Sequence, residues 1–230
     1  FVELVQQLSP VMTVPTFESF VTVLTGWVFA RRRNVTKMIL AAEAVQGKHH
    51  SAFHRVFAAA QWSLDQLGLA VFGQVLAWLG EGQIVLAVDD TLARKRGLKV
   101  YGVGMHHDPL ISSRRKAVTN WGHSWVVLGV IVKFPFCEDK YFCLPILFRL
   151  YISKQTIAKK GGVYRTRPEL AVEMLQGLCQ AYPDRSFHAV ADSAYGGQSV
   201  LGKLPTHCDL TSRLDLDARL YDAPPKRKRG

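Results

Sequence analysis

Residues 83–92 read QIVLAVDDTL, and the fold predicted for this chain follows from them. The apolar run 84–88 is rich in branched side chains and is typical of a buried central strand. Two adjacent carboxylates, Asp89 and Asp90, end that run. An unpaired charge at the end of a buried strand is costly to remove from water, so we expect a cation beside these residues.

A second stretch repeats the pattern. Residues 186–197, SFHAVADSAYGG, form a short apolar strand that ends in Asp192. Two neighbouring parallel strands that end at the same sheet edge would bring Asp89 and Asp192 together, and like charges that close repel unless a divalent cation bridges them. Oxygen ligands indicate Mg²⁺ or Mn²⁺ rather than zinc. The alternative is that each aspartate only caps the helix or turn that follows it.

Charge and hydropathy narrow the class of partner. The chain has 230 residues and a formal net charge of +11. Such a balance favours a polyanionic partner, either nucleic acid or an anionic membrane surface. Apolar runs stay shorter than the roughly 18 residues of a membrane span, so we expect no membrane insertion.

Three segments are predicted. Residues 1–82 have a helical pattern, which fits either a DNA-contacting module of helix-turn-helix type or a plain helical bundle with a solvated basic face. Residues 83–217 carry the strands. Residues 218–230 include APPKRKRG and form a basic, proline-rich linker or tail.

The order of elements predicts the fold class. Strands over 84–90, 98–106 and 123–134 suggest an antiparallel meander, and a helix from Pro168 to Tyr182 crosses over to the strand that ends at Asp192. The prediction is an α/β, ribonuclease-H-like mixed sheet with flanking helices, preceded by an all-helical region. In it both aspartates face two metal ions about 4 Å apart, which suit an in-line phosphoryl displacement.

Two basic clusters follow the first aspartate pair. One surrounds a turn at Gly97 and the other lies between the second and third predicted strands. Cations beside an acidic metal site are what phosphodiester chemistry needs to hold a nucleic-acid strand. The predicted DNA-binding residues are Arg94, Lys95, Arg96, Lys99, Arg114, Arg115 and Lys116.

Four motifs in order, AVDDTLARKRG, YGVGMHHDP, WGHSWVVLGV and AVADSAYGG, resemble the DDE-superfamily endonuclease domain of insertion-sequence transposases, near the IS701-like group. The resemblance implies DNA transposition by a catalytic carboxylate triad with two Mg²⁺ (or Mn²⁺) ions. It implies that the partner is double-stranded DNA, both the transposon ends and the target. It also implies a homodimer in the synaptic complex and a location in a prokaryotic cytoplasm, near the nucleoid.

The resemblance also assigns residues. The first catalytic aspartate of the family stands in a D-x-T pattern that maps to Asp89, with Asp90 in the variable place; if the register slips by one, Asp90 is the metal ligand instead. The second catalytic aspartate maps to Asp192. Thr91, His123 and Tyr195 occupy motif positions that would support the site.

The chain departs from the family at the third carboxylate, a glutamate on a helix well beyond the second aspartate. We interpret the sequence as a transposase truncated before that glutamate and expect the chain alone to be inactive. Two alternatives stay open: a DNA-binding remnant without catalysis, and a stand-alone ribonuclease-H-like nuclease that completes its site with Asp90 or Asp108.

Overall fold

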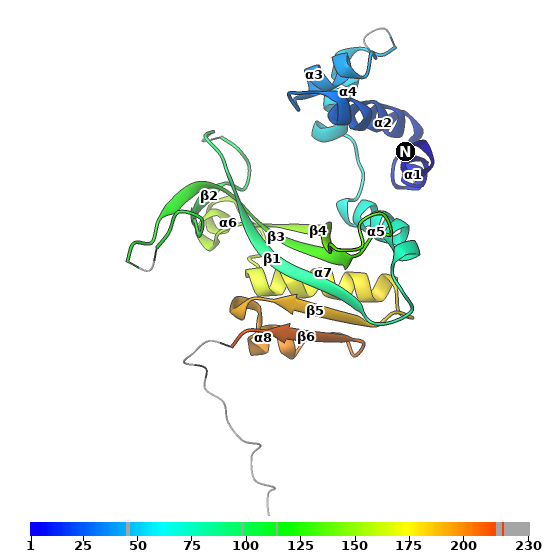
Figure 1. Ribbon diagram of the computed structural model, residues 1–230. Helices are drawn as coiled ribbons and strands as arrows, with labels where there is room; N and C mark the ends of the chain where they lie inside the picture. The colour runs from blue at the N-terminus through cyan, green and yellow to red at the C-terminus, as the bar shows by residue number, and fades with distance from the viewer. Residues whose placement is uncertain (45–46, 98, 114, 215–217, 219–230) are drawn as a thin grey trace, which may run out of the picture. The chain divides into compact units, whose positions relative to one another are not determined.

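Strand β1 (Ile84–Arg94) lies inside a six-stranded sheet in the computed structural model of this protein (Figure 1). It pairs antiparallel with β3 (Thr119–Val132) and parallel with β5 (Phe187–Ala191). The alternate side chains of Ile84, Leu86 and Val88 are buried. The central strand predicted from the apolar run is therefore confirmed.

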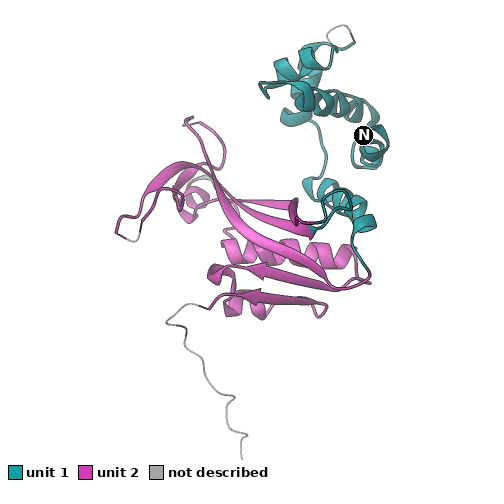
Figure 2. Cartoon of the chain, in the orientation of Figure 1, with its two compact units in different colours: residues 1–80, 132–138 teal, residues 81–131, 139–230 magenta. Residues whose placement is uncertain are grey.

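The structure describes residues 1–44, 47–97, 99–113, 115–214 and 218. The chain divides into two compact units, residues 1–80 with 132–138 and residues 81–131 with 139–230 (Figure 2). Except for residue 218, the predicted basic tail lies outside the described residues.

The sheet of the second unit has the order β2-β3-β1-β5-β6, and β4 also pairs with β3. The remaining strands are β2 (Gly104–His107), β4 (Phe142–Tyr151) and β6 (Cys208–Ser212). The chain thus runs from β1 to the antiparallel β3 and to β4, which pairs with β3, then crosses over through a helix and returns as β5 and β6, parallel to one another and to β1. This is a ribonuclease-H-like arrangement, and the predicted fold class is confirmed.

Two details differ from the expected meander. Strand β2 does not lie between its sequence neighbours: it pairs with the outer edge of β3, because β1 occupies the inner edge as far as Arg94, opposite Gly122. Strand β1 also continues past Asp89 and Asp90 instead of ending there. The reason is that β3 keeps pairing with β1 beyond the point where the shorter β5 stops.

Helix α7 (Arg167–Ala181) crosses one face of the sheet (Figure 1). Its N-terminus carries a capping box, in which Thr166 and Glu169 exchange hydrogen bonds between side chains and backbone, and proline follows at the first turn. Short helices flank the strands: α6 (Lys154–Lys160), the 3₁₀ turn η3 (Ser193–Tyr195) and α8 (Gln198–Leu201). The buried side chains of α7 are Leu170, Ala171, Val172, Met174, Leu175, Leu178 and Cys179.

The first unit is helical, as predicted for its part of the chain. Its helices are α1 (Val2–Gln6), η1 (Ser9–Val11), α2 (Val14–Phe29), α3 (Val35–Ala41), α4 (His50–Ala58), α5 (Leu64–Val75) and η2 (Leu76–Trp78). One buried cluster joins α1 to the start of α2, and another joins α2, α3 and α4 through Val23, Met38, Ile39 and Phe53. Among the described helices, none is both long enough and apolar enough to cross a membrane.

Candidate active site

Asp89 and Asp192 lie side by side in the register of the sheet. Val88 is opposite Ala191 where β1 and β5 last pair, so the next residue on each strand is an aspartate. The alternation of a strand places Asp89 on the face away from the buried Val88, and both aspartates are exposed. The structure therefore brings together the two carboxylates that the sequence singled out, at the edge where β5 ends.

Each of these two carboxylates accepts a backbone hydrogen bond. Asp89 Oδ1 accepts from the Asp90 amide at 2.8 Å, and Asp192 Oδ1 accepts from the Ala194 amide at 3.0 Å. Asp192 is thus the N-cap of η3, as the capping alternative required. Capping uses one oxygen lone pair of four available to a carboxylate, so it orients Asp192 and leaves the group able to bind a cation.

Asp90 turns to the opposite face of β1, toward the N-terminus of α7. Its Oδ2 lies 3.4 Å from Nε of Arg167, and its Oδ1 accepts a long 3.5 Å hydrogen bond from the hydroxyl of Tyr195. Burial raises the pKa of Asp90 and the Arg167 charge opposes that rise, while the negative charges of Asp89 and Asp192 add to it. The three carboxylates therefore lie within electrostatic reach of one another.

Arg167 connects four elements of the sheet unit. Besides its ion pair with Asp90 of β1, its Nε donates to Ser124 Oγ of β3 at 3.1 Å, and its guanidinium carbon lies 4.4 Å from the ring centre of Tyr151 on β4. Sequence reasoning missed this residue. A signal existed, because a cation in the first turn of a helix opposes the macrodipole and so indicates a specific partner.

Tyr195 is the second residue that anchors Asp90. The side chain is 1 % exposed although its hydroxyl belongs to a polar site. Burial raises the pKa of Tyr195 well above its ordinary value, and the charge of Asp90 contributes. Its hydroxyl is therefore a neutral donor to Asp90. The supporting role of Tyr195 at the catalytic carboxylates stays a prediction.

The other two predicted supporting residues have different surroundings. Thr91 is exposed on β1. His123 lies in a ring contact with Trp125 and its Nε2 is 2.7 Å from the carbonyl oxygen of Tyr101, so it fastens the loop before β2. The supporting roles of Thr91 and His123 at the carboxylates stay predictions.

The predicted DNA-binding residues that the structure describes lie on one part of the sheet unit, formed by the end of β1, β2, the start of β3 and the loops between them (Figure 1). We call this part the β1–β3 arm (residues 91–125). Lys95, Arg96, Lys99, Arg115 and Lys116 are exposed in its two loops, whereas Arg114 lies outside the described residues. Trp121 Nε1 donates to the Gly97 carbonyl at 3.0 Å, which fixes the first loop against β3.

Arg94, in contrast, is already paired within the arm. Its Nε lies 2.6 Å from Oδ2 of Asp108, which is 1 % exposed. Asn120 Nδ2 donates to the same oxygen at 2.6 Å and the Leu110 amide donates to Oδ1 at 3.2 Å. These donors, with Arg94 foremost, hold the pKa of Asp108 at about 2. Asp108 is therefore a neutralised structural charge, which weakens the case for it as a third metal ligand.

The site offers a cation two exposed carboxylates. Within the ranges that the structure describes, no group of three or more histidine, cysteine or acidic side chains is arranged to hold a metal ion. Two unneutralised carboxylates on adjacent strands fit a hard divalent cation that keeps several waters, which is the usual manner of Mg²⁺. The donor set fits that ion and remains short of the family's three carboxylates.

Comparisons with known proteins give a family and a relative. A family model described as DDE superfamily endonuclease matches residues 18–230, which include both strands that carry the exposed aspartates. The probable transposase for insertion sequence element IS701 from Microchaete diplosiphon is 26 % identical over 184 residues. That stretch is 80 % of this chain and 44 % of the relative, so the chain spans less than half of the relative's length.

Proposed function

Since this chain belongs to the DDE superfamily endonuclease family, as its motifs indicated, we propose that it acts in DNA transposition: metal-dependent strand cleavage, then strand transfer, at insertion-sequence ends. The observation that carries the proposal is the juxtaposition of Asp89 on β1 and Asp192 at the end of the parallel strand β5, both exposed and neither ion-paired with a cation of the described residues. The IS701 relative supports the same reaction class.

Asp89 and Asp192 would hold the metal ions in this proposal. When bound, Mg²⁺ or Mn²⁺ would activate a water or a 3′-hydroxyl for attack and would stabilise the leaving oxygen. The backbone amides of Asp90 and Ala194 hold one oxygen of each carboxylate, so the side chains are oriented before an ion arrives. The third carboxylate of the triad would come from a residue outside the described part of the chain.

Asp90 would act differently from its neighbour. Its contacts with Arg167 and Tyr195 tie β1 to α7 and to η3, the turn that Asp192 caps. This tie would keep Asp89 and Asp192 at a fixed separation on the other face. The interpretation in which Asp90 is itself a metal ligand stays a prediction, and an Asp90→Asn variant tests it.

The β1–β3 arm would hold the DNA strand. Its exposed cations supply phosphate contacts at a position continuous with β1, the strand that carries Asp89. Double-stranded DNA at the transposon ends and target, and a homodimer in the synaptic complex, belong to the same proposal.

A second candidate function is DNA binding without cleavage. It is favoured by one observation: the described residues assemble two exposed carboxylates, and the third carboxylate near them, Asp90, is paired with Arg167. The chain would then bind DNA through its cations without cleaving it.

Nicking of supercoiled plasmid in the presence of Mn²⁺ separates these candidates. We expect any Mn²⁺-dependent nicking by the unaltered chain to be lost in Asp89→Ala and in Asp192→Ala. Asp139→Ala is the matched control, since Asp139 is an exposed aspartate in the loop before β4. Nicking that survives in both site variants would overturn the catalytic proposal. DNA binding by the unaltered chain, with no nicking by that chain or by its variants, would support the second candidate.

A further inference from the structure

The helical unit has a basic and aromatic surface where α2 meets α3. We call it the α2–α3 elbow and define it by Trp27, Phe29, Arg31, Arg32, Arg33 and Lys37. All six side chains are exposed, and Phe29 keeps 70 % of its surface accessible to solvent. A hollow of about 460 Å³ lies in this surface, lined by Phe29, Arg31, Arg32, Lys37 and three small or aliphatic residues. An aromatic ring beside several cations is the combination that nucleic-acid surfaces use.

The elbow is held in a fixed geometry. Gly26 of α2 lies directly against the backbone of Met38 in α3, where a Cβ would not fit. Val23, Met38 and Ile39 are buried together on the inner side of the two helices. Asn34 caps α3 by accepting a 3.0 Å hydrogen bond from the Lys37 amide. The surface therefore needs little ordering before it binds a partner, which lowers the entropic cost of binding.

One elbow arginine is placed by an aromatic contact. The guanidinium carbon of Arg33 lies 4.5 Å from the ring centre of Trp27, and its Nε donates to the Trp27 carbonyl at 3.4 Å. This stacking holds the charge at the surface without neutralising it. The remaining cations, Arg31, Arg32 and Lys37, form no ion pair with a carboxylate of the described residues.

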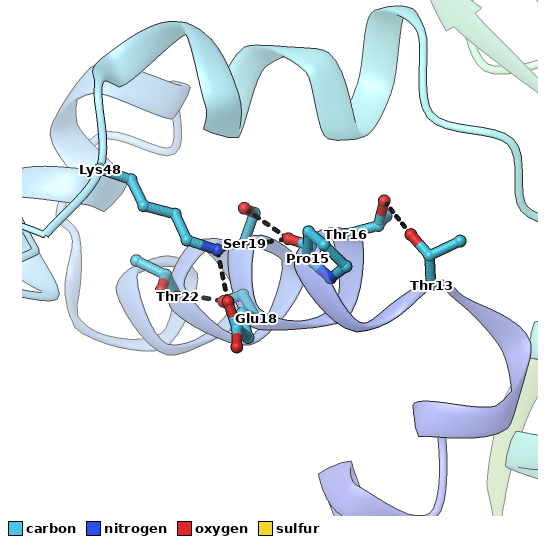
Figure 3. A network of polar contacts seen from close by, with 7 residues as sticks. All are labelled: Thr13, Pro15, Thr16, Glu18, Ser19, Thr22 and Lys48. Atoms are coloured by element: carbon cyan, nitrogen blue, oxygen red, sulfur yellow. Dashed lines mark hydrogen bonds and ion pairs between the residues drawn. The ribbon is translucent and has the colours of Figure 1, made fainter.

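Acidic side chains are kept away from the elbow. Residues 19–42 contain neither aspartate nor glutamate. Glu18, which precedes this stretch in α2, is paired with Lys48 at 2.6 Å, and the same lysine reaches the Pro15 carbonyl at 3.4 Å (Figure 3). The elbow therefore has no acidic residue in its own stretch of sequence, and this local excess of positive charge favours a polyanion.

We propose that the α2–α3 elbow is a DNA contact surface of the helical unit, with Arg31, Arg32 and Lys37 on backbone phosphates and the Phe29 ring against a sugar or base. The proposal rests on the proposed function for the identity of the polyanion. It goes beyond that function because it assigns a second DNA surface, separate in sequence from the β1–β3 arm. For residues 1–82 the proposal favours the first of the two predictions, a DNA-contacting module, over the second, a plain helical bundle.

The test measures binding of the full chain to a labelled 30-base-pair duplex by fluorescence anisotropy at several salt concentrations. The slope of log K against log salt is negative, and each lost phosphate contact on B-form DNA reduces its magnitude by about 0.9, so Arg31→Ala with Arg32→Ala should reduce the magnitude by about 1.8. Lys140→Ala with Lys203→Ala is the control, because it removes the same charge from exposed positions of the other unit. The control should leave the slope within about half a unit of the unaltered value.

Two further variants test the parts of the surface. Lys37→Gln should reduce the magnitude of the salt slope by about 0.9. Phe29→Ala should weaken DNA binding about fivefold or more without changing that slope. Circular dichroism melts check that each variant stays folded, which is expected because these side chains are exposed.

The outcomes are distinct. If the chain binds DNA and the Arg31→Ala with Arg32→Ala variant has the same salt slope as the unaltered chain, the elbow is not a DNA contact surface. The proposed function is then unaffected. If the unaltered chain shows no salt-dependent binding to DNA, both the elbow proposal and the proposed function are wrong. Binding to vesicles containing phosphatidylserine that depends on the elbow, in place of DNA binding, overturns the elbow as a DNA surface and assigns it to an anionic membrane.

Discussion

Two groups of carboxylates in the sheet unit differ in what the chain itself places beside them. Asp108 is buried in the β1–β3 arm, where Arg94 and Asn120 each approach one oxygen at 2.6 Å. Asp89 and Asp192 are exposed, and each accepts a backbone amide hydrogen bond. Asp108 therefore has its countercharge inside the fold, whereas neither Asp89 nor Asp192 forms an ion pair with a cation in the described ranges of the chain.

Asp90 is intermediate between the two groups. It neighbours Asp89 in sequence, yet the alternation of the strand turns it to Arg167 and Tyr195. The comparison teaches that position beside a motif does not decide the role of a carboxylate. A carboxylate that the fold neutralises stabilises the fold, and one that the fold leaves exposed beside another remains available for a metal ion.

The largest expected effect is on metal affinity. Asp89→Asn and Asp192→Asn should each lower Mn²⁺ affinity by at least about tenfold, since loss of even an outer partner of a metal ligand costs about that much. Asp108→Asn should leave the affinity unchanged because its oxygens are already occupied. Isothermal titration calorimetry with Mn²⁺ measures all three variants.

The same titration tests whether Asp89 or Asp90 is the metal ligand of the D-x-T pattern at residues 89–91. If Asp90→Asn lowers Mn²⁺ affinity and Asp89→Asn does not, the ligand is Asp90, and the assignment of the two faces of β1 proposed above is wrong.

A smaller effect is expected from Arg167, which neutralises Asp90. Arg167→Ala leaves a half-buried carboxylate without its cation and removes the contact with the Tyr151 ring. The free energy of unfolding should fall by about 1–3 kcal/mol. Denaturation in urea, followed by circular dichroism, measures it.

Arg167→Lys is the matched variant for this test. Lysine keeps the charge near Asp90 but cannot stack a planar group on Tyr151, so its loss of stability should lie between that of the unaltered chain and Arg167→Ala. Equal stability of Arg167→Ala and the unaltered chain would mean that Asp90 tolerates its position without a partner.

The sequence predicted the features that rest on strand period and on chain order. The apolar run before Asp89, its shorter copy before Asp192 and the helix between them were enough to place two parallel strands side by side. From it we predicted that the exposed aspartates lie close together, because neighbouring parallel strands have their carboxyl ends at the same edge of the sheet.

Other features depend on tertiary pairing and could not be predicted in the same way. Residues 91–94 read TLAR and resemble the start of a turn, but the long β3 gives them a partner and extends β1 through them. Strand β2 has four residues, and its pairing with the outer edge of β3 has no local signal. Arg167 carried a signal, its place in the first helical turn, that became meaningful once Asp90 was seen beside it.

The smallest expected effect is the dependence of stability on the charge of Asp108. Its pKa in the folded chain is about 2, below the ordinary value of 3.8, because Arg94 and Asn120 stabilise the ionised form. A lowered pKa means that this stabilisation is complete above about pH 4 and is lost as the pH falls through about 2. The effect is modest because the side chain of Arg94 is 49 % exposed, so water screens the pair.

Urea denaturation from about pH 6 to about pH 2, for the unaltered chain and for Asp108→Asn, isolates this contribution. The unaltered chain should be the more stable of the two near neutral pH, and the difference between them should shrink steadily toward pH 2, since about half of the Asp108 side chains are then protonated and as uncharged as asparagine. Asp139→Asn, which changes an exposed aspartate, should show no such convergence. A difference between the unaltered chain and Asp108→Asn that stays constant with pH would mean that the shape of the Asp108 side chain, and not its charge, holds the arm. Asp108 would then no longer be the neutralised counterpart of the exposed aspartates.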